Sequence, residues 1–332
     1  MNQLGAGDVA VPPLVAVAGD ASARRYFRFS HDSRSYIVAE APPETEKNTE
    51  FVDIAHLLLG AGIRVPGVHA LDVGRGFLLL DDLGDQLLLP LLVGTEVDHW
   101  YQRAFELLLG FARLGVEQPD ALPGCYDSEL LTEELGRFPE WFAGALLRCE
   151  ITAGDVRVIG ALDELLIDNA LAQPRVLVHR DFHSRNLMVT GADLAVIDFQ
   201  DAVMGPVTYD LVSLLRDCYI RWPGERVHAW ALDYRQRVMA AGLMDAVPED
   251  QFLRWFDLMG LQRHIKVLGT FARLHLRDGK DDYLADLPLV VAYVREVLGA
   301  YRESEPVIEQ FAAWFEERLV PRIEQQRWSR PA

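Results

Sequence analysis

The sequence predicts an α+β fold with two lobes, a small antiparallel sheet at the N-terminal end and a larger, mainly helical part after it. Three features point to this fold. Short strand-like runs separated by turn residues occupy residues 14–80, helical periodicity takes over from residue 96, and a polar loop between short apolar runs interrupts the helical pattern at residues 176–201. A chain of 332 residues that is 50% hydrophobic has enough apolar material for two cores.

The N-terminal lobe begins with a hairpin pattern. Residues 14–30 contain two strand-like runs around a turn rich in small residues at 19–25, and residues 36–39 form a third run. A turn made of Gly, Ala and Ser lets backbone amides approach phosphate groups closely. We therefore expect Ser22 and Ala23 to face phosphates.

A helix and two further strands complete this lobe. Apolar side chains recur at helical spacing in residues 45–59, and the glycines at positions 60 and 62 end the pattern. Residues 68–72 and 76–80 are strand-like. We expect the helix to pack against the sheet that these strands form.

The C-terminal lobe is expected to consist of helices. Amphipathic patterns cover residues 96–112, 128–147 and 156–171, and another helix is predicted to start at residue 208. Trp141 lies within the second of these patterns, where packing in the core and lining of a substrate groove both fit its position.

One loop carries the candidate catalytic chemistry. Residues 179–186 match the spacing H-R-D-x-x-x-x-N, in which Asp181 would accept a hydroxyl proton and the side-chain oxygen of Asn186 would hold a metal ion. Asp198, at the end of the next strand but one, adds a hard carboxylate ligand suited to Mg²⁺. The apolar runs on either side would bury this loop, so we favour catalysis over the simpler interpretation that both acids only cap strand ends.

These motifs resemble those of the aminoglycoside phosphotransferase and choline kinase superfamily, whose members share a protein-kinase-like two-lobe fold. The resemblance implies an ATP-dependent kinase that uses Mg²⁺. Only residues 202–207 separate Asp201 from the next helix, which leaves no room for a long activation segment that docks a peptide. We therefore expect a small-molecule acceptor, and we expect Asp210, early in that helix, to bond to the catalytic loop.

The superfamily pattern is broken on the third strand, where protein kinases carry a lysine that holds the nucleotide phosphates. Glu40 lies near that place. The whole chain has only three lysines: Lys47, Lys266 and Lys280. The positive charge over the phosphates must therefore come from Lys47 or, as we prefer, from an arginine. Three arginines are placed for this role: Arg24 and Arg25 at the hairpin tip, and Arg28 on the second strand.

The exit of the N-terminal sheet resembles the hinge of kinases, whose backbone groups hydrogen-bond the adenine edge. Residues 81–84 read Asp-Asp-Leu-Gly at this place. We place the domain boundary here, with residues 1–83 as the nucleotide-binding lobe and residues 84–332 as the lobe with the catalytic loop and the acceptor-binding helices. Arg28 and Asp82 complete the expected ATP contacts.

The charge and the cysteine content exclude several classes of function. A net charge of -18 makes non-specific binding to nucleic acid or to anionic lipid unfavourable. The cysteines at positions 125, 149 and 218 are far apart and form no C-x-x-C, so neither a zinc site nor a disulfide framework is indicated. Because no apolar run is long enough to span a bilayer, we expect a cytoplasmic, soluble monomer without nucleic-acid or membrane partners.

Several segments narrow the resemblance to one subgroup, the bacterial kinases that phosphorylate the anomeric C1 hydroxyl of N-acetylmuramate and N-acetylglucosamine during peptidoglycan recycling. The segments are residues 19–28, 76–84, 179–188, 262–269 and 277–280. The resemblance implies ATP-dependent phosphorylation of these amino sugars. A hemiacetal hydroxyl is more acidic than an ordinary alcohol, so Asp181 need only orient it and collect its proton late in a loose transition state.

A basic helix is the expected acceptor-binding element. Within residues 260–278, the positions that fall along one side are Arg263, Lys266, Thr270, Arg273 and Arg277. One interpretation is a solvated face paired with neighbouring acids. The other is that the end nearer the catalytic cleft binds an anion, such as the lactyl carboxylate of N-acetylmuramate. His264 beside this stripe, His183 in the catalytic loop and Arg216 on the helix that follows the loop are further candidates for contacts to the sugar.

Other functions stay open at this point. An aminoglycoside or amino-alcohol phosphotransferase of the same fold would need an acidic acceptor pocket, which the net charge permits and the basic helix disfavours. Kinases of neutral sugars share the fold as well. A non-catalytic, nucleotide-binding pseudokinase is suggested by the missing lysine, but the presence of Asp181, Asn186 and Asp198 together counts against it.

Overall fold

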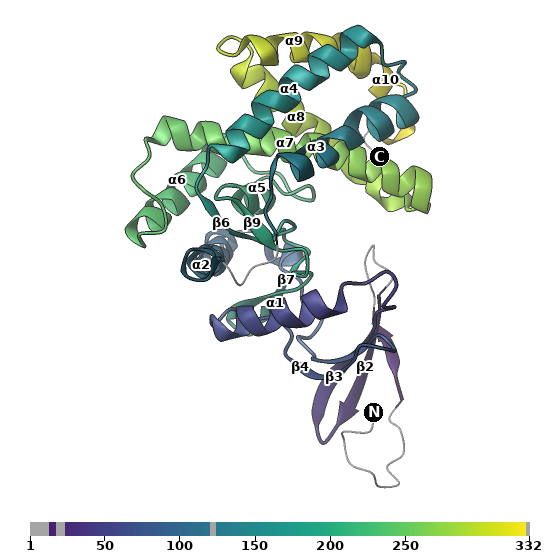
Figure 1. The fold of residues 1–332 in the computed structure, drawn as a ribbon, viewed down its shortest axis with the longest axis vertical. Coiled ribbons are helices and arrows are strands. Elements are labelled where there is room, and N and C mark those ends of the chain that lie inside the picture. Colours follow the sequence, from purple (N-terminus) through teal and green to yellow (C-terminus); the bar gives the residue numbers. More distant parts are fainter. Residues whose placement is uncertain (1–12, 18–23, 120–123, 330–332) are drawn as a thin grey trace. The chain divides into compact units, whose positions relative to one another are not determined.

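The computed structural model describes residues 13–17, 24–119 and 124–329. The chain forms two compact units: Met1–Leu114 with Ser184–Ala202 make the first, and Gly115–His183 with Val203–Ala332 make the second. The expected small antiparallel sheet and the mainly helical remainder are both confirmed (Figure 1). The lobe boundary expected after residue 83 stays a prediction, since the first unit continues past it and also takes in a later segment.

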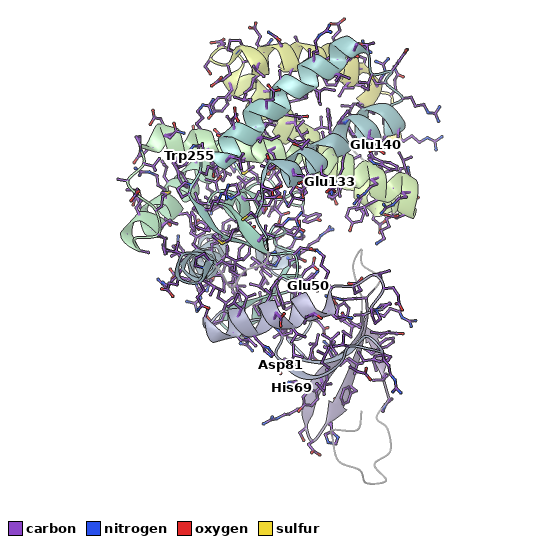
Figure 2. All side chains as sticks on the ribbon, in the orientation of Figure 1. Glu50, His69, Asp81, Glu133, Glu140 and Trp255 are labelled. Atoms are coloured by element: carbon purple, nitrogen blue, oxygen red, sulfur yellow. The ribbon has the colours of Figure 1, made fainter. Side chains whose placement is uncertain are left out.

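The first unit is built on a five-stranded sheet in the order β1-β2-β3-β5-β4, with every neighbouring pair antiparallel. Its strands are β1 Val15–Val17, β2 Arg25–His31, β3 Arg34–Glu40, β4 Val68–Asp72 and β5 Phe77–Asp81. A two-residue turn at Asp32 and Ser33 joins β2 to β3, and its φ angles of 48° and 63° are those of the turns that suit the right-handed twist of a hairpin. At the other edge, Nε2 of His69 lies 2.7 Å from Oδ1 of Asp81 and ties β4 to β5 (Figure 2).

Helix α1, Asn48–Gly60, packs on one face of this sheet. Its buried apolar side chains follow the expected helical spacing: Phe51, Ile54, Ala55 and Leu58. Phe51 shares a small internal space with Ala39 and Leu78 of the sheet. Nδ2 of Asn48 donates a hydrogen bond of 2.8 Å to the carbonyl oxygen of Ala41, which fixes the start of α1 to the end of β3.

The first unit also contains a second hairpin and most of a long helix. A single 3₁₀ turn, η1 Leu89–Leu91, precedes the helix α2 Val97–Glu117, and the hairpin pairs β7 Leu187–Thr190 with β8 Asp193–Val196. The backbone N–H of Leu88 donates to the carbonyl of Leu187 at 2.8 Å, and the N–H of Val196 donates to the carbonyl of Arg64 at 2.9 Å. Main-chain hydrogen bonds therefore hold both strands of this hairpin, and they fix the segment that leads to Asp198.

The second unit is mainly helical and has one short antiparallel pair, β6 Arg175–Val178 with β9 Val203–Pro206. Its helices are α3 Ser128–Arg137, η3 Phe138–Leu146, α4 Ala153–Leu171, α5 Tyr209–Leu215, α6 Gly224–Ala240, α7 Glu249–Asp278, η4 Asp281–Asp286, α8 Leu287–Tyr301, α9 Pro306–Trp314, η5 Phe315–Leu319, α10 Val320–Ile323 and η6 Arg327–Ser329. The helix α4 begins with a reciprocal pair of side-chain hydrogen bonds between Thr152 and Asp155, which satisfies backbone donors at its first turn. Within the described ranges, no helix combines the length and the apolar composition of a membrane span.

Helix α7 lies at the centre of the second unit, and every residue from Trp255 to Gly269 is buried (Figure 1). A helix that is buried on all sides is surrounded by other elements rather than by water. The solvated-face interpretation is therefore wrong for Arg263 and Lys266, which are only 3% and 8% exposed. Gly269 allows a close crossing of α7 over the junction of α3 and η3, because a Cβ there would lie 2.4 Å from the carbonyl carbon of Arg137.

An aromatic cluster fills the core beside α7. The ring of Phe311 lies 6.1 Å from Phe138 and 5.2 Å from Trp314, centroid to centroid. The indole N–H of Trp314 donates to Oδ1 of Asp155 at 2.7 Å, so its polar end is satisfied. Trp141 is partly buried against this core, which makes it a packing residue.

Candidate active site

The predicted catalytic loop leaves β6 after Val178, and the chain passes from the second unit into the first between His183 and Ser184. The second unit contains Asp181, and the first contains Asn186 and Asp198. The predicted site residues thus fall into two groups: a base half around Asp181 in the second unit, and a metal half around Asn186 and Asp198 in the first.

Asp210 fixes the backbone of the base half, as expected. Its carboxylate accepts hydrogen bonds from two successive backbone amides, that of His179 at 2.5 Å and that of Arg180 at 3.0 Å. The side chain is 3% exposed. Burial raises the pKa of Asp210 to about 6, although His179 and the two amide donors act in the opposite direction. The residue immediately after this anchor is Asp181.

A buried ionic cluster holds the side chain of Arg180. Nη2 of Arg180 lies 2.5 Å from Oε1 of Glu134 on α3, and Nζ of Lys266 lies 2.9 Å from the same oxygen. Glu134 also accepts a hydrogen bond from the hydroxyl of Tyr126, and Lys266 donates to the hydroxyl of Tyr209 at 2.9 Å. Arg180 itself has a φ of 77°, a strained left-handed conformation for a residue other than glycine. The cluster and Asp210 together maintain this conformation.

The surroundings of Asp181 keep its carboxylate ionised. Its backbone N–H donates to Nδ1 of His179 at 3.2 Å, and its side chain remains open to solvent. Partial loss of hydration raises its pKa, but the surrounding positive groups, Lys266 first and then His183 and Arg263, outweigh this effect and bring the pKa of Asp181 down to about 2. Asp181 therefore presents a negative charge at every pH at which the protein would work.

Two of the four predicted acceptor residues lie in the electrostatic neighbourhood of Asp181. The imidazole of His183 packs edge-to-face on Tyr219, with ring centroids 5.4 Å apart. Burial lowers the pKa of His183 despite the nearby carboxylates of Asp217 and Asp181. Arg263 is buried and directs Nη1 toward Sγ of Cys218 at 3.4 Å. An imidazole and a fixed guanidinium thus accompany the carboxylate of Asp181.

The other two predicted acceptor residues, Arg216 and His264, make buried contacts within the protein. Nη2 of Arg216 bonds to Oδ1 of Asp257 at 2.7 Å, and the guanidinium lies 5.1 Å from the centre of the Phe256 ring. His264 is fully buried, its Nε2 donates to the carbonyl of Arg216 at 3.0 Å, and its ring stacks on Tyr293 at 4.7 Å. Burial lowers the pKa of His264 to about 3, so the ring is neutral. Their contact with an acceptor stays a prediction.

The metal half is formed by the β7–β8 hairpin and the residues just after it. The carbonyl of Asn186 accepts from the N–H of Ile197 at 3.1 Å, which links the start of β7 to the end of β8. Asp198 is exposed and has a φ of 65°, and Nε2 of Gln200 donates to its Oδ1 at 2.8 Å. Phe199 is fully buried and stacks on Phe51 of α1 at 4.7 Å. The backbone at Asp198 is therefore fixed on both sides.

The donor atoms of the metal half suit a hard cation. Asn186 and Asp198 offer a carboxamide and a carboxylate oxygen, the ligand types that Mg²⁺ prefers. Among the described residues, no group of three or more His, Cys, Asp or Glu side chains could enclose a metal ion by itself. A cation here would need further oxygen ligands from a substrate, as Mg²⁺ in kinases takes them from nucleotide phosphates.

The structure describes two of the four predicted nucleotide-binding residues, Arg28 and Asp82. Ser22 and Ala23 lie outside the described residues. Arg28 and Asp82 contact each other, with Nε of Arg28 2.6 Å and Nη2 2.9 Å from the two carboxylate oxygens. Arg28 also bonds to Asp85 at 2.8 Å. This bidentate pair links β2 to the residue after β5, and a role for either partner in binding ATP stays a prediction.

The sequence interpretation missed the carboxylate at the centre of the ionic cluster. Glu134 lies three residues after Leu131 and four before Phe138, which places it on the apolar side of α3. A glutamate at such a position was the one sign in the sequence that this carboxylate is buried. Tyr126 and Tyr209 gave no signal, because an aromatic residue in an apolar segment is ordinarily part of the core. Their rings meet edge-to-face at 4.9 Å beneath the cluster.

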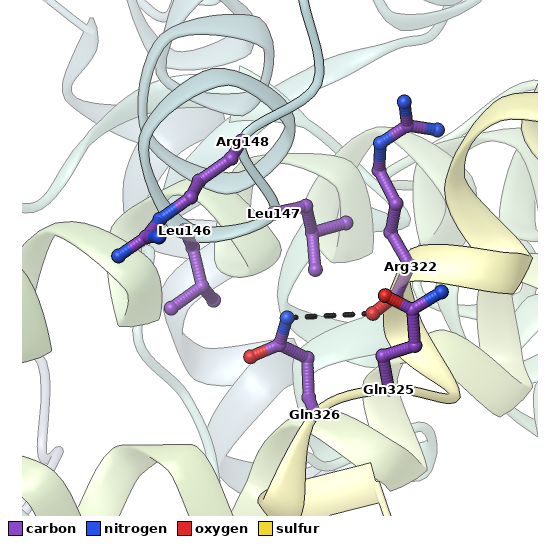
Figure 3. A pocket seen from close by; sticks show the side chains of 6 residues that line it. All are labelled: Leu146, Leu147, Arg148, Arg322, Gln325 and Gln326. Atoms are coloured by element: carbon purple, nitrogen blue, oxygen red, sulfur yellow. Dashed lines mark hydrogen bonds between the residues drawn. The ribbon is translucent and has the colours of Figure 1, made fainter.

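A separate polar hollow lies far along the chain from the catalytic loop. Figure 3 shows its lining, which comes from the end of η3 and from the C-terminal helical turns. The lining residues are Leu146, Leu147, Arg148, Arg322, Gln325 and Gln326. Nε2 of Gln326 donates to the carbonyl of Arg322 at 3.3 Å across it. None of the predicted site residues that the structure describes lines this hollow.

Known proteins are similar to this chain over the segment that contains Asp181, Asn186 and Asp198. The profile of the Phosphotransferase enzyme family matches residues 13–256. A protein from Pseudomonas putida named N-acetylmuramate/N-acetylglucosamine kinase is 46% identical over 306 residues, which cover 92% of this chain and 89% of that protein. A protein of the same name from Neisseria meningitidis is 39% identical over 298 residues, 89% of this chain and 88% of its own length.

Solved structures resemble the fold at low sequence identity. A choline/ethanolamine kinase family protein from Mesorhizobium loti superposes with a TM-score of 0.62 at 15% identity and covers 94% of each chain. A choline kinase from Streptococcus pneumoniae gives a TM-score of 0.59 at 15% identity, covering 86% of this chain and 93% of its own. These likenesses confirm the expected protein-kinase-like fold, and the family profile spans both halves of the site. The chain belongs to the phosphotransferase enzyme family.

Proposed function

We propose that this enzyme transfers the γ-phosphoryl group of ATP to the anomeric C1 hydroxyl of N-acetylmuramate and N-acetylglucosamine. The observation that carries the proposal is an identity of 39–46%, over 89–93% of this chain, to three relatives that have this activity in their names. The geometry of the base half supports it, because a fixed, ionised carboxylate beside positive side chains suits an acidic hydroxyl on a polar acceptor.

Asp181 is the residue that would orient the C1 hydroxyl. Because its pKa is about 2, it accepts a hydrogen bond from the hydroxyl but removes little of the proton in the ground state. In a loose transition state the bond from phosphorus to its leaving oxygen on ADP is largely broken before the C1 oxygen bonds to phosphorus. The C1 hydroxyl proton then passes to Asp181 as that new bond forms, and it leaves to solvent with the products.

The anchors of the base half would keep Asp181 in position during this step. Asp210 holds the two preceding amides, and Glu134 holds Arg180 from α3. A catalytic group that is held in place before the substrate binds needs no reorganisation when it reacts.

In the metal half, Asn186 and Asp198 would hold Mg²⁺, which when bound neutralises charge on the nucleotide phosphates. The chain's own contribution is the rigid mounting of these two ligands. Gln200 holds the carboxylate of Asp198 from one side, and the packing of Phe199 on Phe51 fixes the backbone beneath it.

Arg263 is the residue best placed to recognise the carboxylate of N-acetylmuramate. It is the arginine whose charge acts directly on Asp181, and its helix is held rigidly at the centre of the second unit. Arg273, ten residues further along the same helix, is less deeply buried than Arg263. A carboxylate bonded to a guanidinium gains a charge-assisted hydrogen bond, which N-acetylglucosamine cannot make at that place.

A panel of acceptors with Mg²⁺ and ATP tests the proposal. N-acetylmuramate, N-acetylglucosamine, glucose, choline and kanamycin would each be incubated with the enzyme, and the phosphorylated position would be read by ³¹P and ¹H NMR. We expect a C1 phosphate on both amino sugars and little turnover of the other three. Turnover of kanamycin or choline without the amino sugars would replace the proposed acceptor while leaving the family unchanged.

A further inference from the structure

The third strand has no lysine, and alanines occupy the two buried positions at and just after its end. Side chains alternate between the two faces of a strand. Ala39 and Ala41 point to the buried face and are 1% and 0% exposed. Glu40, which we expected near the lysine position, points to the other face and pairs with the exposed Arg25 at 2.6 Å. A lysine that pointed to the buried face near the end of β3 would therefore have to occupy position 41, where this chain has an alanine.

Arg24 lies across from this position on the neighbouring strand. Arg25 pairs with Glu40 at the end of the β2–β3 register, so continuing this register by one residue beyond both strands sets Arg24 opposite Ala41. Directly opposed residues of an antiparallel pair project to the same face, with Cβ atoms about 5 Å apart. Arg24 accordingly lines the internal space beneath α1 that Ala39 also lines. Its guanidinium lies 4.9 Å from the centre of the Phe51 ring.

Ala41 itself is held firmly, so this opposition is a fixed feature of the sheet. Its N–H donates to the carbonyl of Gly76 at 2.7 Å. Gly76 has a φ of 70°, and a Cβ there would lie 2.1 Å from the carbonyl oxygen of Ala41. The same oxygen accepts the hydrogen bond from Asn48 at the start of α1.

Arg24 is joined to α1 on one side and to the metal half on the other. Its Nε lies 3.0 Å from Oε2 of Glu46, which precedes α1, and both side chains are almost completely buried. Its Nη1 donates to Oε1 of Gln200 at 3.4 Å, and Gln200 in turn donates to Asp198. The chain of contacts Glu46, Arg24, Gln200 and Asp198 lies within the first unit.

Arg24 and Glu46 resemble the lysine–glutamate ion pair of protein kinases, with an arginine as the cation and a glutamate just before the helix as its partner. In protein kinases the third-strand lysine is held by a glutamate of the following helix and reaches the nucleotide phosphates. We infer that Arg24 is the phosphate-binding cation of this enzyme, displaced by one strand from the usual lysine position and held by Glu46. The inference rests on the nucleotide use that we propose above. A guanidinium has five N–H donors in a planar fork, so it can bond to Glu46 and to phosphate oxygens together.

The other candidate cations are committed elsewhere within the described residues. Arg28 is bound by the carboxylates of Asp82 and Asp85. Lys47 is exposed and pairs with Asp201 at 2.6 Å. Arg25 points to the opposite face from Arg24.

Binding of ADP and of adenosine, measured by calorimetry with Mg²⁺ and without an acceptor, tests the inference independently of the sugar. Arg24→Ala should weaken ADP binding about ten- to hundred-fold, the effect of losing a charge-assisted hydrogen bond, and should leave adenosine binding within a few fold. Arg24→Lys should retain most of the ADP affinity. Arg34→Ala, which removes an exposed arginine of β3 in the same unit, is the matched control and should change neither value.

Moving the positive charge to another position distinguishes a role of Arg24 in phosphate binding from a role in packing alone. The double variant Arg24→Ala with Ala41→Lys places a lysine on the third strand, opposite the vacated position, and should recover ADP affinity lost in Arg24→Ala. Thermal unfolding would be followed for every variant. If Arg24→Ala does not fold, Arg24→Met and Glu46→Gln should still lose ADP affinity selectively.

Four outcomes would overturn the inference. In two of them, Arg24→Ala binds ADP as the wild type does, or loses ADP and adenosine affinity equally while its melting temperature is unchanged. Selective loss of ADP affinity in Lys47→Ala or Arg25→Ala, with Arg24→Ala unaffected, would assign the role to another cation. A wild-type protein that bound no ADP at all would instead refute the proposed function, and the inference with it.

Discussion

Replacing Glu134 by glutamine tests whether the buried ionic cluster positions the catalytic loop. The glutamate is fully buried, and one of its carboxylate oxygens lies 2.5 Å from Arg180 and 2.9 Å from Lys266. Burial raises its pKa, but Lys266 and Arg180 outweigh burial, so the pKa of Glu134 lies below its ordinary value. An amide of the same shape would remove the carboxylate that Arg180 and Lys266 share and leave Lys266 only the more distant charge of Asp181.

The expected cost follows from these contacts. Removing one partner of a buried ion pair costs about 3–5 kcal/mol. Lys266 keeps a hydrogen bond to the hydroxyl of Tyr209 at 2.9 Å, so we expect the lower end of this range, about 3 kcal/mol in the free energy of unfolding. Burial and Arg180 lower the pKa of Lys266, and Glu134 raises it. In the variant the pKa of Lys266 should therefore fall, and its loss of a proton would relieve the penalty as the pH rises.

Urea unfolding at pH 6 and pH 9, together with steady-state kinetics, measures these effects. We expect the loss of stability to be larger at pH 6, and kcat to fall about ten- to hundred-fold because Arg180 no longer holds the loop of Asp181. Glu133→Gln is the matched control (Figure 2), since Glu133 is exposed on the same helix and pairs with Arg137 in an i,i+4 contact of 2.9 Å. It should change the unfolding free energy by less than about 0.5 kcal/mol.

Two results would refute this reasoning. Equal stability of Glu134→Gln and Glu133→Gln would show that the cluster contributes no net ionic stabilisation. A variant that is destabilised by about 3 kcal/mol but retains wild-type kcat would show that Asp210 alone positions the loop.

Three further predictions concern single carboxylates and the acceptor arginine. Asp181→Asn should lower kcat about 10²- to 10⁴-fold and leave ADP affinity unchanged, because the hydroxyl loses its proton acceptor while the first unit is untouched; wild-type turnover would contradict the assigned role. Arg263→Met should reduce kcat/KM for N-acetylmuramate about ten- to hundred-fold and that for N-acetylglucosamine only a few fold, and an equal loss for both sugars would argue against carboxylate recognition. Asp163→Asn should stabilise the protein at pH 8 by about 1–4 kcal/mol and have little effect at pH 4 in urea unfolding. Burial raises the pKa of Asp163 to about 7, so the native state bears a poorly hydrated charge only above that pH, and an equal effect at both pH values would contradict this cause.

The elements that we predicted correctly have local signals. The strands at 68–72 and 77–81 and the helix at 48–60 follow from alternation and helical spacing within a few residues. The loop 179–186 was predictable for the same reason, since its chemistry lies in one short motif. For helix α7 the solvated-face interpretation of its basic positions was wrong in part. This helix is buried on all sides over much of its length, so Arg263 and Lys266 have no solvent-facing side to lie on.

The partners of buried charges were not predictable in the same way. Glu134 and Arg180 are 46 residues apart in sequence, and no local pattern relates them. The opposition of Arg24 and Ala41 depends on the register of two strands, which the turn at Asp32 and Ser33 sets. Sequence spacing therefore left Lys47 and several arginines as candidates for the missing lysine, and the strand register is what favours Arg24 in our inference.

The low pKa of Asp181 favours some acceptor hydroxyl groups over others. A carboxylate whose pKa is about 2 takes a proton only when the attacking oxygen has almost become a phosphate ester, so an acidic hydroxyl is favoured over an ordinary alcohol. The hemiacetal hydroxyl at C1 of an amino sugar meets this condition better than the alcohol of choline. Lys266 and Arg263, which lower the pKa of Asp181, would also repel a polycationic aminoglycoside. The same buried charges thus favour an acidic hydroxyl and disfavour a cationic acceptor, and this argument from electrostatics is independent of the sequence identity to the amino-sugar kinases.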